Sequence, residues 1–60
     1  IRNCVNNLVY IWEINGRGYW AYLDRFDRGF LSGWKWIGRR WIKFNQHVKR
    51  VDAILCYKNH

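Results

Sequence analysis

The sequence predicts a mostly β fold: a small antiparallel sheet of about five strands, curled into a barrel or a sandwich. Val, Ile, Tyr, Phe and Trp, which favour strands, make up 22 of the 60 residues. Ala, Leu, Glu and Gln together make up eight, and proline is absent. Sixty residues are too few for a linker and a second domain. We therefore expect one small domain over residues 1–60.

A β-hairpin is predicted near the start of the chain. Residues 8–14 (LVYIWEI) form a β-branched and aromatic run, and residues 19–24 form a second one. Asn15-Gly16 follows the first run directly, and Asn-Gly is the strongest short-range hairpin signal because both residues accept positive φ. The two runs are therefore expected to pair as antiparallel neighbours.

The middle of the chain predicts a connection followed by a second hairpin. Residues 25–33 carry two glycines and charges of both signs, so we expect a connection there, with a short strand around Phe30. Residues 34–37 and 40–44 flank a Gly-Arg pair and are rich in Trp and Ile. These two segments are therefore expected to form the second hairpin.

The last strand is predicted at residues 51–57 (VDAILCY), after a turn or a single helical turn over residues 45–50. An alternative places an amphipathic helix over residues 34–55, because apolar side chains recur there at spacings of three and four. That stripe consists of Trp34, Ile37, Trp41, Phe44, Val48, Val51 and Leu55. Gly38 inside the stripe and the scarcity of good helix formers around it favour strands over the helix.

Aromatic side chains are expected on both faces of the predicted strands. Alternation in the first run places Tyr10 and Trp12 on one face, and Val9 and Ile11 on the other. The second run divides into Trp20 with Tyr22, and Tyr19 with Ala21 and Leu23. A domain of this size cannot enclose five Trp, four Tyr and three Phe in one core, so part of these rings must be exposed.

The two cysteines, Cys4 and Cys56, stand near opposite ends of the chain. A disulfide between them would close a loop over almost the whole domain, which suits a small secreted protein with a limited core. The alternative is a pair of reduced thiols packed as small apolar side chains, as in a cytoplasmic protein. The even number of cysteines and their placement favour the disulfide.

The net charge predicts an anionic partner. Eleven Lys and Arg residues against four acids give a formal charge of +7 on a short chain. An anionic lipid or cell-wall surface satisfies this charge, and nucleic acid satisfies it as well. No run of about 18 uncharged apolar residues is present, so no membrane-spanning helix is expected.

The segment over residues 34–44 (WKWIGRRWIKF) interleaves rings with cations and is the candidate binding site. Trp favours the headgroup level of a bilayer, so Trp34, Trp36 and Trp41 are the expected interfacial aromatic residues. The expected surface-binding cations are Lys35, Arg39, Arg40, Lys43, Lys49 and Arg50. The same interleaving also suits single-stranded nucleic acid, whose bases stack on exposed rings. A third interpretation is a hairpin with its rings in the core and its cations in water.

No catalytic residues, cofactor or metal site are predicted. The two histidines and two cysteines lack the CxxC or HxxxH spacing that gathers metal ligands. The sequence contains no nucleophile elbow and no phosphate-binding glycine loop. We therefore expect a protein that is not an enzyme and needs no cofactor.

Residues 19–56 carry a pattern of aromatic, glycine and late basic positions. The positions concerned are Tyr19, Trp20, Tyr22, Gly33, Trp34, Lys35, Trp36, Gly38, Trp41, Phe44, Arg50, Val51, Asp52 and Cys56. In this pattern the sequence resembles a group of short, aromatic-rich, uncharacterised bacterial proteins. The group usually has Pro where Leu23 stands and Gly where Asn45 stands. The resemblance implies one compact domain with structural roles for Gly38 and Asp52, and it implies no activity.

These observations lead to two hypotheses about function. The first is a secreted, disulfide-closed, cationic and tryptophan-rich miniprotein of antimicrobial or bacteriocin type, which binds anionic bacterial membranes or surfaces. The second is a cytoplasmic nucleic-acid-binding module with a small barrel fold and reduced cysteines. The state of Cys4 and Cys56 distinguishes these two hypotheses. The direction in which Trp34, Trp36 and Trp41 point decides between a binding surface and the interpretation that places the rings in the core.

Overall fold

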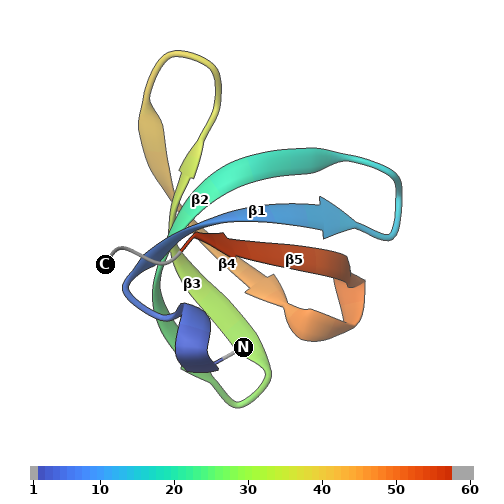
Figure 1. Cartoon of the computed structure of the whole chain (residues 1–60). Helices are drawn as coiled ribbons and strands as arrows, with labels where there is room; N and C mark the ends of the chain where they lie inside the picture. Colours follow the sequence, from blue (N-terminus) through green and yellow to red (C-terminus); the bar gives the residue numbers. More distant parts are fainter. Residues whose placement is uncertain (1, 58–60) are drawn as a thin grey trace.

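The computed structural model describes residues 2–57 as a single antiparallel sheet (Figure 1). Its strands are β1 (Asn7–Glu13), β2 (Gly18–Asp27), β3 (Phe30–Trp36), β4 (Trp41–His47) and β5 (Val51–Tyr57). Two short 3-10 turns, η1 (Arg2–Cys4) and η2 (Val48–Arg50), complete the fold. The predicted mostly β fold with five antiparallel strands is confirmed, and the alternative helix over residues 34–55 is wrong.

The β1–β2 hairpin forms where the sequence predicts it. Gly16 takes a φ of +89°, and the Asn15 side chain accepts a hydrogen bond from the Arg17 amide at 2.9 Å. The Glu13 amide donates to the Arg17 carbonyl at 2.7 Å, which closes the turn. The Asn-Gly pair therefore forms the turn through its own backbone conformation, as its position between two apolar runs predicts.

The connection predicted over residues 25–33 is much shorter than expected, because β2 runs on to Asp27 and β3 begins at Phe30. The strand expected around Phe30 is confirmed and is longer than predicted. Arg28 and Gly29 form a two-residue turn with φ values of 54° and 82°. Positive φ at both central positions is the geometry of a tight hairpin turn. The sequence pattern does not predict this turn, because arginine rarely takes a positive φ.

A bulge in β2 bends the sheet at its centre. The β2–β3 register passes from Leu23 opposite Gly33 to Arg25 opposite Ser32, so Asp24 is the extra residue. A Cβ at position 33 would overlap the Tyr22 carbonyl oxygen. Glycine therefore permits the close approach of the two backbones at this point.

The connection between β4 and β5 ties the two halves of the sheet together. The predicted turn over residues 45–50 is shorter than expected, because β4 extends to His47 and only η2 remains as a single 3-10 turn. The Val48 amide donates to the Gly29 carbonyl at 2.8 Å, and the Ile14 amide donates to the Arg50 carbonyl at 2.9 Å. The turn η2 thus contacts both the β2–β3 and the β1–β2 hairpins.

The core lies on the inner face of the folded sheet. Five side chains are fully buried: Val9, Ile11, Ala21, Leu23 and Leu31. Partly buried side chains, including Phe26, Phe44 and Ile54, pack around them. The order β4-β3-β2-β1-β5 leaves β4 and β5 as the edges of a sheet that is bent into a sandwich-like form and is not closed into a barrel.

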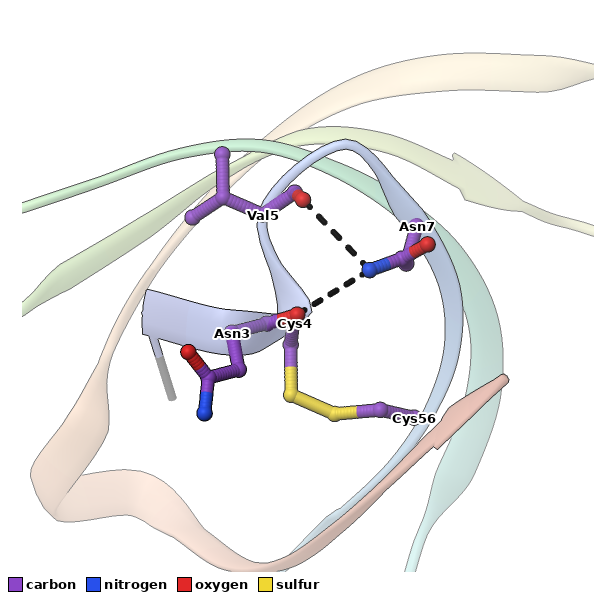
Figure 2. Close-up of a disulfide and its surroundings, with 5 residues drawn as sticks. All are labelled: Asn3, Cys4, Val5, Asn7 and Cys56. Carbon is purple, nitrogen blue, oxygen red and sulfur yellow. Dashed lines mark hydrogen bonds between the residues drawn. A yellow bond between two sulfur atoms is a disulfide. The ribbon is translucent and has the colours of Figure 1, made fainter. Parts of the chain in front are cut away.

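The predicted disulfide is confirmed and joins η1 to β5 (Figure 2). The Cα atoms of Cys4 and Cys56 are 5.6 Å apart, and Cys4 is buried in the core cluster. The Asn7 side chain donates hydrogen bonds to the Asn3 and Val5 carbonyls at 3.0 and 3.5 Å, as Figure 2 shows. These contacts hold the N-terminal segment against the end of the sheet.

Candidate functional site: an aromatic face

The outer face of the sheet carries all five tryptophans of the protein. We define the aromatic face as ten side chains: Leu8, Tyr10, Trp12, Trp20, Tyr22, Trp34, Trp36, Trp41, Leu55 and Tyr57. Nine of them keep 36 to 45% of their surface exposed, and Tyr10 is partly buried. Trp34, Trp36 and Trp41 therefore point outward, and the interpretation that places these rings in the core is wrong.

The strand register explains why these side chains share one face. Leu8 is paired with Tyr22, and Tyr22 is paired in turn with Trp34. A second row contains the pairs Tyr10 with Trp20 and Tyr10 with Leu55. Because paired residues project from the same side of a sheet, alternation along each strand brings the rings of all five strands together.

Neighbouring rings on the aromatic face pack against one another. The ring centroid of Tyr10 is 4.8 Å from that of Trp12 and 5.0 Å from that of Trp20. Trp20 also packs on Tyr57 at 5.3 Å. The Tyr10–Trp20 contact is edge-to-face at 83°, and the other two are tilted at 58° and 40°, so none of these rings is stacked flat on its neighbour.

The β3–β4 hairpin contributes the other part of the aromatic face. Trp36 and Trp41 are paired across it, with ring centroids 5.4 Å apart. Together with Leu8 and Trp20 they line an open apolar groove of about 360 Å³. The groove connects the rings of β3 and β4 with those of β1 and β2, so the aromatic face is continuous.

Of the six predicted cations, Lys43 is the one paired within the aromatic face. It lies opposite Trp34 in the register, and its Nζ atom is 5.6 Å from the Trp34 ring centroid. Arg39 and Arg40 are exposed in the turn between β3 and β4, next to Trp36 and Trp41 in the chain.

The other three predicted cations lie away from the aromatic face. Lys35 projects from the inner side of β3, where its Nζ atom is 5.1 Å from the Tyr19 ring centroid. Lys49 and Arg50 belong to η2. The structure therefore brings Arg39, Arg40 and Lys43 together with the rings and separates the remaining cations from them.

Tyr19 is the titratable group whose pKa changes most clearly among the described residues. It is half-buried on the inner side of the sheet, where its ring packs on Phe44 with centroids 5.9 Å apart. Burial raises the pKa of Tyr19 to about 12, and the nearby charge of Glu13 adds to the effect. The phenol therefore stays neutral and acts as a packing group.

Several members of the aromatic face were not among the predicted site residues: Leu8, Tyr10, Trp12, Trp20, Tyr22, Leu55 and Tyr57. The signal that was present is the alternation of Tyr10 with Trp12 and of Trp20 with Tyr22. Alternation separates two faces but does not say which face is open. The register with β3 and β5, which joins these rings to Trp34 and Trp36, becomes known only from the folded sheet.

Residues 2–57 contain no group of three or more His, Cys, Asp or Glu side chains that could hold a metal ion. The same residues contain no helix that is long and apolar enough to cross a membrane. No protein family, curated protein or solved structure matches this chain. The fold and the site together define a small disulfide-linked β domain with an open aromatic face.

Proposed function

We propose that this protein is a secreted, cationic, tryptophan-rich miniprotein of antimicrobial or bacteriocin type that acts at anionic bacterial membranes or surfaces. The observation that carries the proposal is the placement of all five tryptophans on one open face. Trp is enriched at the membrane interface, where its apolar ring and its polar N–H both find partners. A continuous face of such rings suits adsorption to a bilayer.

The position of the cations supports the same proposal. Lys43 is paired with Trp34 of the aromatic face, and Arg39 and Arg40 lie in the β3–β4 turn between Trp36 and Trp41. Each Lys or Arg near an anionic membrane contributes about 1 kcal/mol of attraction. Rings and cations can therefore contact the interface in a single orientation, with the aromatic face toward the lipid.

Two observations make nucleic acid the weaker alternative. The rings of Tyr10, Trp12 and Trp20 already pack against one another, whereas a nucleic-acid base needs an exposed ring on which to stack. The Cys4–Cys56 disulfide is typical of proteins in oxidising compartments, which supports export rather than a cytoplasmic role. A lipid interface requires neither free flat rings nor reduced thiols.

Vesicle binding and leakage test the proposal. Tryptophan emission should shift to the blue, and trapped dye should leak, with vesicles that contain phosphatidylglycerol, and much less with vesicles of phosphatidylcholine alone. Growth inhibition of bacteria should fade as salt is added, because salt screens the attraction. No leakage and no killing at micromolar concentrations would contradict the proposal. Salt-sensitive quenching by an oligonucleotide, without vesicle binding, would favour the nucleic-acid alternative.

Two lysines offer a matched pair of variants for this experiment. Lys43→Gln and Lys35→Gln remove the same charge, one beside the Trp34 ring of the aromatic face and one on the inner side of β3. We expect Lys43→Gln to weaken binding to anionic vesicles several-fold and Lys35→Gln to weaken it less. Equal losses would show that net charge alone, rather than the aromatic face, determines binding.

A further inference from the structure

We infer that, in water, the aromatic face packs against the same face of a second copy of this chain, forming a symmetric sheet-on-sheet dimer. Soluble monomers rarely leave a large contiguous apolar patch open, because its exposure to water is unfavourable. Here nine large apolar side chains on one face are each at least 36% exposed. This inference concerns the protein free of lipid, and it does not depend on the proposed action at membranes.

The size of the molecule matches the area that such a dimer needs. The two longer extents of the chain are 32 and 29 Å. A stable interface of standard size buries about 800 Å² on each partner, roughly a patch 28 Å across. The aromatic face draws on all five strands, from Leu55 and Tyr57 on one edge strand to Trp41 on the other. The exposed rings thus come from both edges of the sheet, and an interface of that size takes about a sixth of the total surface of 4616 Å².

The distribution of charge permits two copies to approach through this face. The ten side chains of the aromatic face are uncharged, and Lys43 is the charged residue paired directly with one of them. Arg17, Arg39 and Arg40 are in turns, and Lys49 and Arg50 are in η2. The contact itself is thus uncharged, and the cations nearest to it, Lys43, Arg39 and Arg40, lie at its β3–β4 end, where two copies repel each other at low salt.

The symmetry of the contact follows from the use of one patch by both copies. A two-fold axis lets each partner offer the same rings and the same groove. The groove between Leu8, Trp20, Trp36 and Trp41 is a recess of about 360 Å³ that apolar side chains of the second copy can fill. Packed sheets lie about 10 Å apart, which leaves room for one interdigitated layer of such side chains.

Salt should affect the dimer and the membrane-bound form in opposite directions. Two copies of charge +7 repel each other, so screening this repulsion favours the dimer. Binding to an anionic surface is attractive, so the same screening weakens it. The aromatic face is the contact in both cases, and the monomer is therefore the form that reaches the membrane.

Sedimentation of the intact, oxidised protein without lipid tests the inference. We expect the mean mass to rise from 7.5 kDa toward twice that value as the protein concentration increases. The protein concentration at which half of the chains are dimeric should decrease when salt is added. All five tryptophans lie on the aromatic face, so their emission should shift to the red on dilution through the same midpoint. A monomer at every concentration up to about 1 mM would overturn the inference, as would open-ended aggregation.

A charge inserted into the face provides the matched variant. Trp41→Lys places a cation among the rings of β4, and we expect it to raise the dissociation constant of the dimer at least about tenfold. Ile14→Lys makes the same charge change at a side chain that is 67% exposed and lines a different groove, with Glu13 and Arg50. Ile14→Lys should raise the dissociation constant of the dimer several-fold less than Trp41→Lys does.

A second variant keeps the test decisive if Trp41→Lys fails to fold. Leu55→Lys introduces a cation at the opposite edge of the aromatic face, on β5, and should have the same effect as Trp41→Lys. A variant counts as folded when its circular dichroism spectrum matches that of the wild type. If a folded variant has the same dimer dissociation constant as the wild type, the inference is overturned. A dimer that forms in a protein without leakage activity would leave the inference standing and contradict the proposed function alone.

Discussion

The ring of Tyr10 lies directly over the backbone of Gly18, with its Cε2 atom 2.6 Å from the position that a Cβ at residue 18 would occupy. A side chain at position 18 would therefore push the Tyr10 ring aside from its present position. Tyr10 in turn contacts both Trp12 and Trp20, so this glycine supports the centre of the aromatic face.

Gly18→Ala should displace the Tyr10 ring and lower the free energy of unfolding by about 1 kcal/mol, because Tyr10 must move against Trp12 and Trp20. Urea denaturation measures this loss, and near-ultraviolet circular dichroism measures the altered ring packing. In a Tyr10→Ala background the same substitution should have a much smaller effect, because the clash is gone. An additive double mutant would contradict this account of Gly18.

Loss of the disulfide should strongly destabilise the domain. The Cys4–Cys56 bond spans 52 residues of sequence, and removing such a link costs roughly 2–4 kcal/mol. A Cys4→Ala and Cys56→Ala double variant should therefore unfold at a lower urea concentration than the oxidised protein. Reduction of the wild type should lower the midpoint similarly. A midpoint unchanged by reduction would show that hydrogen bonding and packing hold η1 without the covalent link.

Alkaline pH should destabilise the protein through Tyr19. Its pKa is about 12 in the folded state against 10.0 for an ordinary tyrosine, so the unfolded chain releases this proton first. The stability that neutral Tyr19 contributes is complete below pH 10 and is lost as pH rises from 10 to 12. Tyr19→Phe should flatten the fall of the unfolding free energy over this range. A slope that Tyr19→Phe leaves unchanged would contradict this assignment.

The turn between β2 and β3 should accept a stabilising substitution. Arg28 has a φ of 54°, a conformation that is costly for most residues and that asparagine tolerates better. Arg28→Asn creates an Asn-Gly turn and should raise the free energy of unfolding by about 0.5–1 kcal/mol. Arg39→Asn removes the same charge from a residue without positive φ and controls for reduced charge repulsion. Equal stabilisation by both variants would assign the gain to charge.

The sequence predicted the fold class and most strands because local signals and hydrophobic pattern agree there. Asn15-Gly16 and its two flanking runs specify the first hairpin without help from the rest of the chain. The segment over residues 51–57 is predicted with the bounds that the structure shows. The prediction failed at Arg28-Gly29, where tertiary pairing imposes a turn geometry that arginine does not favour by itself.

The candidate site was predicted only in part for a similar reason. Trp34, Trp36 and Trp41 stood out because cations interleave with them in the sequence. Their principal neighbours on the open face, including Trp20 and Tyr57, come from strands distant in the chain and meet through register. The projection of Lys35 to the inner side also follows from register, since it is paired with Ala21.

The sheet order has a consequence for the time course of synthesis. The last strand, β5, pairs with the first, β1, on the edge opposite to β2. During synthesis the outer edge of β1 therefore stays unpaired until β5, which begins at Val51, has left the ribosome. An unpaired strand edge next to exposed rings is prone to pairing with other chains. The nascent chain is thus most vulnerable to aggregation just before β5 joins, and a chaperone that shields β1 at that stage should raise the yield of folded protein.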